Sequence, residues 1–148
     1  MKQAQILVVG GGHAGVEAAL AVSRKRLNVT LATMDEDSIG RMSCNPAIGG
    51  LAKGHLVREI DALGGIMGEA ADQTAIQFKT LNKSKGRAVW SPRAQVDKIK
   101  YSQYIQQAIK KNKYIKVVSK NVVDIVVDNG KVVGCVYDTG ERVSLGAL

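Results

Sequence analysis

The chain opens with an apolar run, Ile6–Val9, that leads through glycines into residues with helical spacing. The helical stretch ends near Lys25, and a second apolar run follows at Val29–Thr33. An apolar strand, an amphipathic helix and a second apolar strand in this order form a βαβ unit, whose two strands lie parallel. We therefore predict an α/β fold that begins with a βαβ unit over residues 5–33.

Helical spacing returns in two later segments. Residues 39–50 are rich in residues that interrupt regular structure, and apolar positions then recur at helical intervals from Leu51 to Leu63. This pattern predicts a loop that leads into a helix over residues 39–65. A further helix is predicted from about Ala94 to Lys111, with Val96 in its apolar stripe.

Short β-rich runs fill the last part of the chain. Asp-Asn-Gly and Asp-Thr-Gly turns separate the last three of them, which supports hairpins. We predict a small antiparallel meander over residues 115–145, and a meander after a βαβ unit is typical of flavin-binding folds, which favours FAD. The predicted strands are Ile115–Val118, Val122–Val127, Val132–Tyr137 and Arg142–Leu145.

Length and composition limit the class of protein. The 148 residues are 45% hydrophobic, which fits one globular domain, and no apolar run is long enough to cross a membrane. The few residues before the first strand leave no room for a leader peptide, so we expect a cytoplasmic protein. Cys44 and Cys135 match no zinc spacing, and we predict neither a metal site nor a disulfide.

The net charge of +8 favours a polyanionic partner. Most of the excess lies in a basic segment, residues 79–120, where twelve Lys or Arg accompany the single acid Asp97. Such a segment forms either a solvated helix face or a nucleic-acid contact, and the sequence leaves both open. Aromatic residues within it could stack on unpaired bases or pack into the core. They are Trp90, Tyr101 and Tyr104.

The turn after the first strand has the glycine spacing of a dinucleotide-binding loop. Gly10 permits the tight turn, Gly12 lets backbone N–H groups approach a pyrophosphate, and Gly15 lets the helix pack on the strand. The phosphates would lie at the positive end of the helix that begins near His13. The alternative is a glycine-rich turn that binds nothing. The predicted cofactor contacts are Gly10, Gly11, Gly12, His13, Ala14 and Gly15, with His13 as a spacer rather than a base.

Two other places offer candidate chemistry. Asp35 follows the second strand where an acidic residue commonly binds the adenosine ribose, although Asp35–Asp37 could equally be a solvated loop. Cys44 lies near a predicted helix N-terminus with basic neighbours, and could be a nucleophile or proton donor, or an ordinary thiol. Short polar residues and glycines of the same loop suit a second cofactor contact, although helix caps use the same residues. They are Ser43, Asn45, Gly49 and Gly50.

Long motifs carry a resemblance over essentially the whole chain. They are residues 10–19 (GGGHAGVEAA), 42–50 (MSCNPAIGG), 53–65 (KGHLVREIDALGG), 76–78 (IQF) and 81–86 (LNKSKG). They resemble the N-terminal part of the tRNA uridine 5-carboxymethylaminomethyl modification enzymes, the glucose-inhibited division protein A family. The loop at 42–50 discriminates far better than a glycine fingerprint alone.

The resemblance implies a Rossmann-like FAD-binding domain and an enzyme that acts on tRNA. With a GTPase partner, such an enzyme adds an aminomethyl or carboxymethylaminomethyl group to carbon 5 of the wobble uridine. It uses methylenetetrahydrofolate as carbon donor, NADH as reductant and glycine or ammonium as amine source, and the family forms homodimers. Because the sequence stops where the family continues, we expect an N-terminal fragment, incomplete at its C-terminal end and inactive alone.

The resemblance also implies residue roles. The glycine loop would hold the FAD pyrophosphate, Val122 would meet the adenine through its backbone, and Cys44 would be the thiol close to the flavin and the target base. Basic positions for tRNA or phosphate contact are Lys53, Arg58, Lys83, Lys85 and Arg93. The alternatives are a flavin- and folate-dependent tRNA uracil-5 methyltransferase, which should lack the loop at 43–46, and a cofactor-free basic RNA-binding module.

Overall fold

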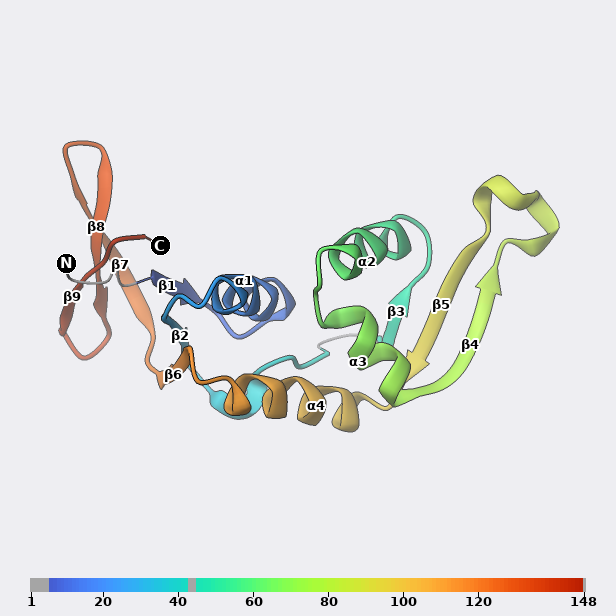
Figure 1. Cartoon of the computed structure of the whole chain (residues 1–148), viewed down its shortest axis with the longest axis horizontal. Coiled ribbons are helices and arrows are strands. Elements are labelled where there is room, and N and C mark those ends of the chain that lie inside the picture. The colour runs from blue at the N-terminus through green and yellow to red at the C-terminus, as the bar shows by residue number, and fades with distance from the viewer. Residues whose placement is uncertain (1–5, 43–44, 148) are drawn as a thin grey trace. The chain divides into compact units, whose positions relative to one another are not determined.

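The computed structural model describes residues 6–42 and 45–147 of the chain (Figure 1). The chain divides into two compact units, whereas its length alone suggests one domain. One unit runs up to Ile39 and resumes at Gln106, and the other is Gly40–Ile105. Each unit has its own sheets. Within the described residues, no helix is long and apolar enough to cross a membrane.

The first unit begins with the predicted βαβ element. It consists of β1 (Ile6–Val9), α1 (His13–Arg24) and β2 (Val29–Thr33). The strands pair in parallel, with Ile6 opposite Val29, as the sequence pattern predicts. The buried residues of α1 are Val16, Ala19, Leu20 and Ser23, and their spacing of three or four residues places them on one face of the helix.

A third strand, β6 (Ile115–Ser119), completes the parallel sheet in the order β1-β2-β6. This corrects the prediction that residues 115–118 belong to the meander. The strand pairs with β2 to its end, because the Lys120 N–H still donates to the Thr33 carbonyl at 2.9 Å. A helix precedes it, and a strand that returns from a crossover helix to its own sheet lies parallel to its neighbour.

The meander itself comprises β7 (Val122–Asp128), β8 (Lys131–Tyr137) and β9 (Arg142–Ser144), all antiparallel. The two-residue turn between β7 and β8 has positive φ at Asn129 and Gly130, as the Asn-Gly signal predicts. Cys135 and Tyr137 of β8 form a buried cluster with Leu7 and Ala32 of the parallel sheet. This cluster joins the meander to the βαβ element.

The outer edge of β1 meets residues near the other end of the chain. Ile6 forms a parallel bridge with Ala147, and the Leu7 N–H donates to the Ala147 carbonyl at 3.0 Å. The contact covers the beginning of β1. Val9, at the end of the strand, is 50% exposed.

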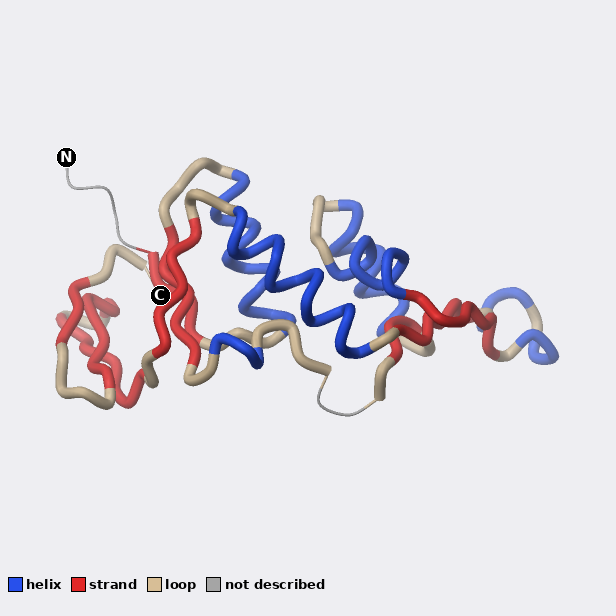
Figure 2. The backbone as a smooth tube through the Cα atoms, turned by 90° about the horizontal axis from the view of Figure 1, so that it is seen from below, coloured by secondary structure: helices blue, strands red, loops and turns tan. Residues whose placement is uncertain are grey.

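The second unit is built on an antiparallel sheet in the order β3-β5-β4 (Figures 1 and 2). In Figure 2 the strands β4 and β5 form a long ribbon that ends in short helical turns. Its elements are β3 (Ala47–Gly49), α2 (Lys53–Ala62), α3 (Met67–Thr74), β4 (Ala75–Leu81) and β5 (Ser91–Val96).

The last helix, α4 (Lys98–Lys111), begins later than the predicted Ala94. Ala94 and Val96 are buried on either side of the exposed Gln95, which is the alternation of a strand, and they belong to β5. Asp97 then starts the helix, because its Oδ1 accepts hydrogen bonds from the N–H groups of Ile99 and Lys100 at 3.0 and 3.1 Å.

Candidate functional site

The glycine loop at the end of β1 is held by one backbone hydrogen bond and by two places where the backbone packs too closely for a Cβ. Gly10 has a φ of +100°, which favours glycine, and its N–H donates to the Ala32 carbonyl of β2 at 2.8 Å. A Cβ at Gly15 would lie 1.9 Å from the Gly10 carbonyl oxygen, so α1 packs directly against the turn. Gly11 is buried, and a Cβ there would lie 2.9 Å from Ile39 Cγ1.

Gly12 differs from Gly11 and Gly15 because it faces open space, and it differs from Gly10 because its backbone conformation does not require glycine. A Cβ built on it would meet no atom within 4 Å, and its φ of −71° is ordinary for any residue. It precedes the first turn of α1, whose N–H groups have no carbonyl partners within the helix and carry the positive end of its dipole. His13 is half-buried and Ala14 is exposed. Open volume in front of backbone donors fits the diphosphate of a dinucleotide.

Asp35 lies at the same end of the sheet as the glycine loop. Its Oδ1 accepts a hydrogen bond from the Asp37 N–H at 2.9 Å, which caps a short 3-10 helix, Glu36–Ser38. Thr33, two residues earlier, ends β2, and a Cβ at Gly11 would lie 3.2 Å from its hydroxyl oxygen. The structure thus brings the exposed Asp35 near the loop, with one carboxylate oxygen already used in the cap.

Val122 lines an apolar groove beside β1. The groove has a volume of about 650 Å³, and its walls include Val8 and Val9 of β1, Ala18 of α1, and Val122 and Ile125 of β7. Apolar walls of this kind suit the face of a flat aromatic ring. Val122 is therefore beside the strand that leads into the glycine loop, although it lies 112 positions after Gly10 in the sequence.

The remaining predicted cofactor contacts belong to the second unit. Ser43 and Cys44 lie outside the described residues, and Asn45 is exposed. Gly49 and Gly50 have positive φ, and the Gly50 N–H donates to the Pro92 carbonyl of β5 at 2.8 Å. The β3–β5 contact thus uses the N–H group of a residue that the sequence predicts as a cofactor contact.

Lys53 and Arg58 have different surroundings on α2. The Lys53 ammonium donates to the Ala47 carbonyl at 3.1 Å and so ties the helix to β3. Arg58 lines a pocket of about 240 Å³ that also contains Arg93, Asp61 and Asp72. Sequence reasoning missed these carboxylates, although the spacing from Arg58 to Asp61 places both on one helix face.

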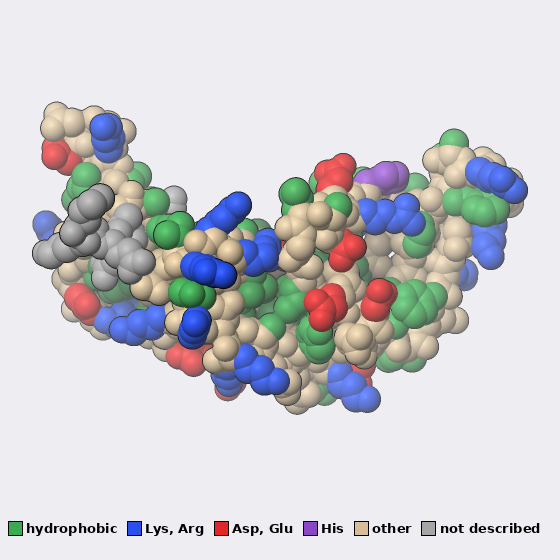
Figure 3. Space-filling view, viewed as in Figure 1, with side chains coloured by type: hydrophobic (Ala, Val, Ile, Leu, Met, Phe, Trp, Pro, Cys, Tyr) green, Lys and Arg blue, Asp and Glu red, His purple; other side chains and the backbone are tan. Residues whose placement is uncertain are grey.

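Lys83 and Lys85 lie in a 3-10 turn at the outer end of the β4–β5 ribbon. Figure 3 shows Lys and Arg side chains gathered at that end. The sequence from Gln73 to Val96 contains no acidic residue, so the whole ribbon is basic. The predicted site residues are thus divided between the two units.

Comparisons with known proteins agree with this fold. A family model described as Glucose inhibited division protein A matches residues 5–147. The tRNA uridine 5-carboxymethylaminomethyl modification enzyme MnmG of Aquifex aeolicus is 55% identical over 129 residues, which are 87% of this chain and 21% of that protein. The enzyme of the same name from Thermodesulfovibrio yellowstonii is 52% identical, over 94% of this chain and 22% of its own length.

A solved structure matches equally well. The form II crystal structure of Aquifex aeolicus GidA superimposes with a TM-score of 0.90 at 51% identity, covering 96% of this chain and 24% of that one. This chain therefore spans about a fifth of the length of the curated relatives it matches.

Proposed function

The chain belongs to the glucose-inhibited division protein A family, and we propose that it forms the FAD-binding part of a tRNA-modifying enzyme. The observation that carries the proposal is the open volume in front of Gly12, at the positive end of α1. Gly10 and Gly15 shape the turn so that this volume stays clear of side chains. When bound, FAD would supply the redox chemistry of the reaction.

The residues of the first unit have complementary roles in this proposal. N–H groups at the start of α1 would bind the diphosphate, and the exposed Asp35 would accept hydrogen bonds from the adenosine ribose. Val122 would bind the adenine end through its backbone at the apolar groove. Supporting this division of roles, the three positions lie in one unit at or beside the parallel sheet.

The proposed reaction is the addition of an aminomethyl or carboxymethylaminomethyl group to carbon 5 of the wobble uridine of tRNA. Methylenetetrahydrofolate and NADH would be the co-substrates, and a GTPase the partner protein. We further propose that the complete enzyme is a cytoplasmic homodimer. The names of the two relatives and the net charge of +8 support tRNA as the substrate. Since the chain spans about a fifth of those proteins, we propose that it is inactive alone.

Cys44 is the proposed catalytic thiol, near the flavin and the target base. Among the polar groups of its loop it offers the strongest nucleophile at neutral pH once ionised. Ser43, Asn45 and Gly49 would line the same part of the site. Lys53, Arg58, Lys83, Lys85 and Arg93 are the proposed contacts to phosphates of the tRNA or cofactor.

A chimera tests the proposal. The chain replaces the matching segment of the Aquifex aeolicus enzyme, and flavin content and modified nucleosides are measured by absorbance and by mass spectrometry. We expect a yellow protein that modifies tRNA, and a Cys44→Ser variant that keeps flavin while losing modification. Gly12→Val should lose the flavin because a branched side chain would occupy the phosphate position, whereas Ala21→Val, an exposed change on the same helix, should retain it.

The outcomes separate the parts of the proposal. Flavin retained by Gly12→Val would show that the phosphates bind elsewhere. Full turnover by Cys44→Ser would exclude the thiol from catalysis. A colourless chimera that still binds tRNA would favour a cofactor-free RNA-binding module, and 5-methyluridine as product would favour a methyltransferase.

A further inference from the structure

Three aromatic side chains of the basic segment have different surroundings in the structure. Tyr101 is fully buried, and the Tyr104 hydroxyl donates a hydrogen bond to Glu69. Trp90 is 42% exposed and precedes β5 at the outer end of the ribbon. Of these three, Trp90 therefore offers a ring surface to a partner.

Local hydrogen bonds hold Trp90 in place. Its indole Nε1–H donates to the Lys83 carbonyl at 3.3 Å, and its backbone N–H donates to the Arg87 carbonyl at 3.2 Å. Asn82 closes the same turn, because its Nδ2 donates to the Val89 carbonyl at 3.3 Å. The polar edge of the indole is thus used within the protein, and fixing the side chain before binding lowers the entropy cost of an interaction through its ring.

We name residues 82–90 the ribbon tip. It carries Lys83, Lys85 and Arg87, all exposed, and the nearest acidic residues in the sequence are Asp72 and Asp97. The Arg87 guanidinium lies 5.9 Å from the centroid of the Trp90 ring, within the range of a cation–π interaction. The ribbon tip therefore combines a fixed aromatic ring, a guanidinium within cation–π range of it and two further cations.

The chemistry that matches all of these features is a polyanion that presents flat rings. Unpaired nucleotides supply a phosphate every residue and a base whose face can stack on Trp or on an Arg plane. A base-paired duplex supplies the phosphates but keeps its base faces stacked inside the helix. An acidic peptide supplies charge without the regular flat rings.

We propose that the ribbon tip binds single-stranded RNA, with Trp90 and Arg87 stacking on one unpaired base and Lys83 and Lys85 contacting the flanking phosphates. The proposal rests on the proposed function, in which the wobble uridine of tRNA is the target. Lys83 and Lys85 are already among the proposed phosphate contacts. The new parts are Trp90 as a stacking residue and the ribbon tip as the element that binds the RNA.

Because Trp90 is the single tryptophan of the chain, its fluorescence reports on this residue alone. We titrate the 148-residue chain with a U-rich single-stranded decamer RNA and with a blunt RNA duplex, and measure tryptophan emission alongside the anisotropy of fluorescein-labelled RNA. Stacking should quench the emission with the single strand and leave it nearly unchanged with the duplex. Trp90→Ala should weaken single-strand binding by about 5- to 100-fold, and Trp90→Phe, which keeps a stacking ring, much less.

Salt dependence tests the cations separately. The double variant Lys83→Ala/Lys85→Ala should reduce the slope of log K against log salt by about 1.4, because each lost contact to a single-stranded phosphate removes about 0.7. The matched control is Lys110→Ala/Lys111→Ala, which removes the same charge from the exposed end of α4 and should leave the slope unchanged. Circular dichroism of every variant checks that the fold is retained.

Several results would overturn the proposal. They are unchanged affinity in Trp90→Ala, equal quenching by the duplex, no binding of the single strand by the wild-type chain, or equal slopes in both double variants. The FAD proposal and the stacking proposal can be refuted separately. A chimera that lacks flavin but still shows stacking at Trp90 would refute only the FAD proposal. A Trp90→Ala chimera that modifies tRNA normally, with an unchanged KM for tRNA, would refute only the stacking role of Trp90.

Discussion

Gly15 approaches Gly10 so closely that a Cβ on Gly15 would lie 1.9 Å from the Gly10 carbonyl oxygen. The oxygen belongs to the turn that ends β1, and its residue is also bound to β2 through the Gly10 N–H. Glycine at position 15 therefore serves the packing of α1 against the turn. Glycine at position 12, where a Cβ would meet nothing, has no packing role of this kind.

We predict that Gly15→Ala lowers the free energy of unfolding by about 1–3 kcal/mol, because the backbone must shift to relieve the overlap. Gly12→Ala is the matched control, and it should change stability by less than about 0.5 kcal/mol. Urea unfolding followed by far-UV circular dichroism measures both. Equal stability of the two variants would contradict the packing described for Gly15.

Asn112 joins α1 to the turn before β6. Its Nδ2 donates to the Ser23 hydroxyl at 2.9 Å, and its Oδ1 accepts from the Tyr114 N–H at 3.0 Å. We predict that Asn112→Ala costs about 1–2 kcal/mol of unfolding free energy, since it leaves two part-buried groups without their partner. Asn121→Ala, at an exposed position, serves as the control in the same denaturation experiment. Similar losses in both variants would show that the Asn112 bonds add nothing.

Asp97 determines where α4 begins. Its carboxylate accepts from two N–H groups of the first turn, so Asp97→Ala should destabilise the chain by about 0.5–2 kcal/mol. Asp97→Asn keeps a side-chain acceptor at the cap and should recover most of the loss. If Asn and Ala prove equally destabilising, the charge of Asp97 matters more than its capping hydrogen bonds.

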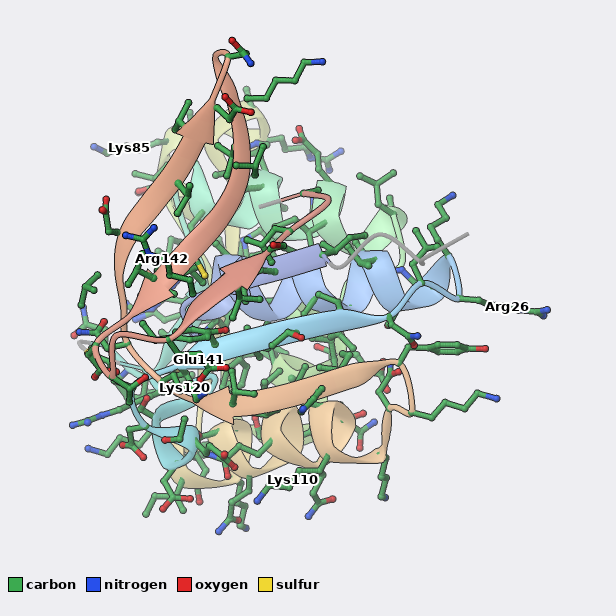
Figure 4. The ribbon with its side chains drawn as sticks, turned by 90° about the vertical axis from the view of Figure 1, so that its left-hand side faces the viewer. Arg26, Lys85, Lys110, Lys120, Glu141 and Arg142 are labelled. Carbon is green, nitrogen blue, oxygen red and sulfur yellow. The ribbon has the colours of Figure 1, made fainter. Side chains whose placement is uncertain are left out.

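Alkaline pH should destabilise the first unit. Burial raises the pKa of the Cys135 thiol above its ordinary value of 9.0, and burial likewise raises the pKa of the Tyr137 hydroxyl above 10.0. A hydrogen bond to Glu141 raises the pKa of Lys120, and Figure 4 shows these two labelled side chains together. For all three groups the folded state binds the proton more tightly than the unfolded state. Stability is therefore complete below the ordinary pKa and falls as the pH rises through the folded pKa.

Thermal unfolding between pH 8 and pH 11 tests this sign. We expect the melting temperature to fall above about pH 9, the ordinary pKa of the Cys135 thiol. Cys135→Ala should flatten the first part of that fall because it removes the most readily ionised of these groups. A melting temperature that rises with pH, or a Cys135→Ala profile parallel to that of the wild type, would refute the assignment.

The βαβ element could be predicted from the sequence because its signals are local. Each strand is a short apolar run, and the turn between β1 and α1 requires glycine for reasons that the neighbouring residues reveal. The Asn-Gly turn of the meander is of the same kind. In these places, residues that are close together in the sequence determine the local structure.

The second unit was harder to predict because its contacts join distant residues. Together with Ile99, the apolar residues Ala94 and Val96 fit the spacing of one helix face, although both belong to β5. The capping role of Asp97 can be predicted only when the strand before it is recognised. The bond from the Gly50 N–H to Pro92 depends on pairing between β3 and β5, and the proximity of Arg58 to Asp72 depends on packing of α2 beside α3. Such pairings leave no local pattern in the sequence.

The bridge between Ile6 and Ala147 has a consequence for behaviour at high concentration. An open strand edge presents unpaired backbone groups that another molecule can extend by β-pairing, which is a common start of aggregation. Ala147 covers the first half of the β1 edge, so intermolecular pairing at this edge would have to begin beside Val9. The backbone contact with Ala147 thus limits intermolecular pairing at this edge to the second half of β1.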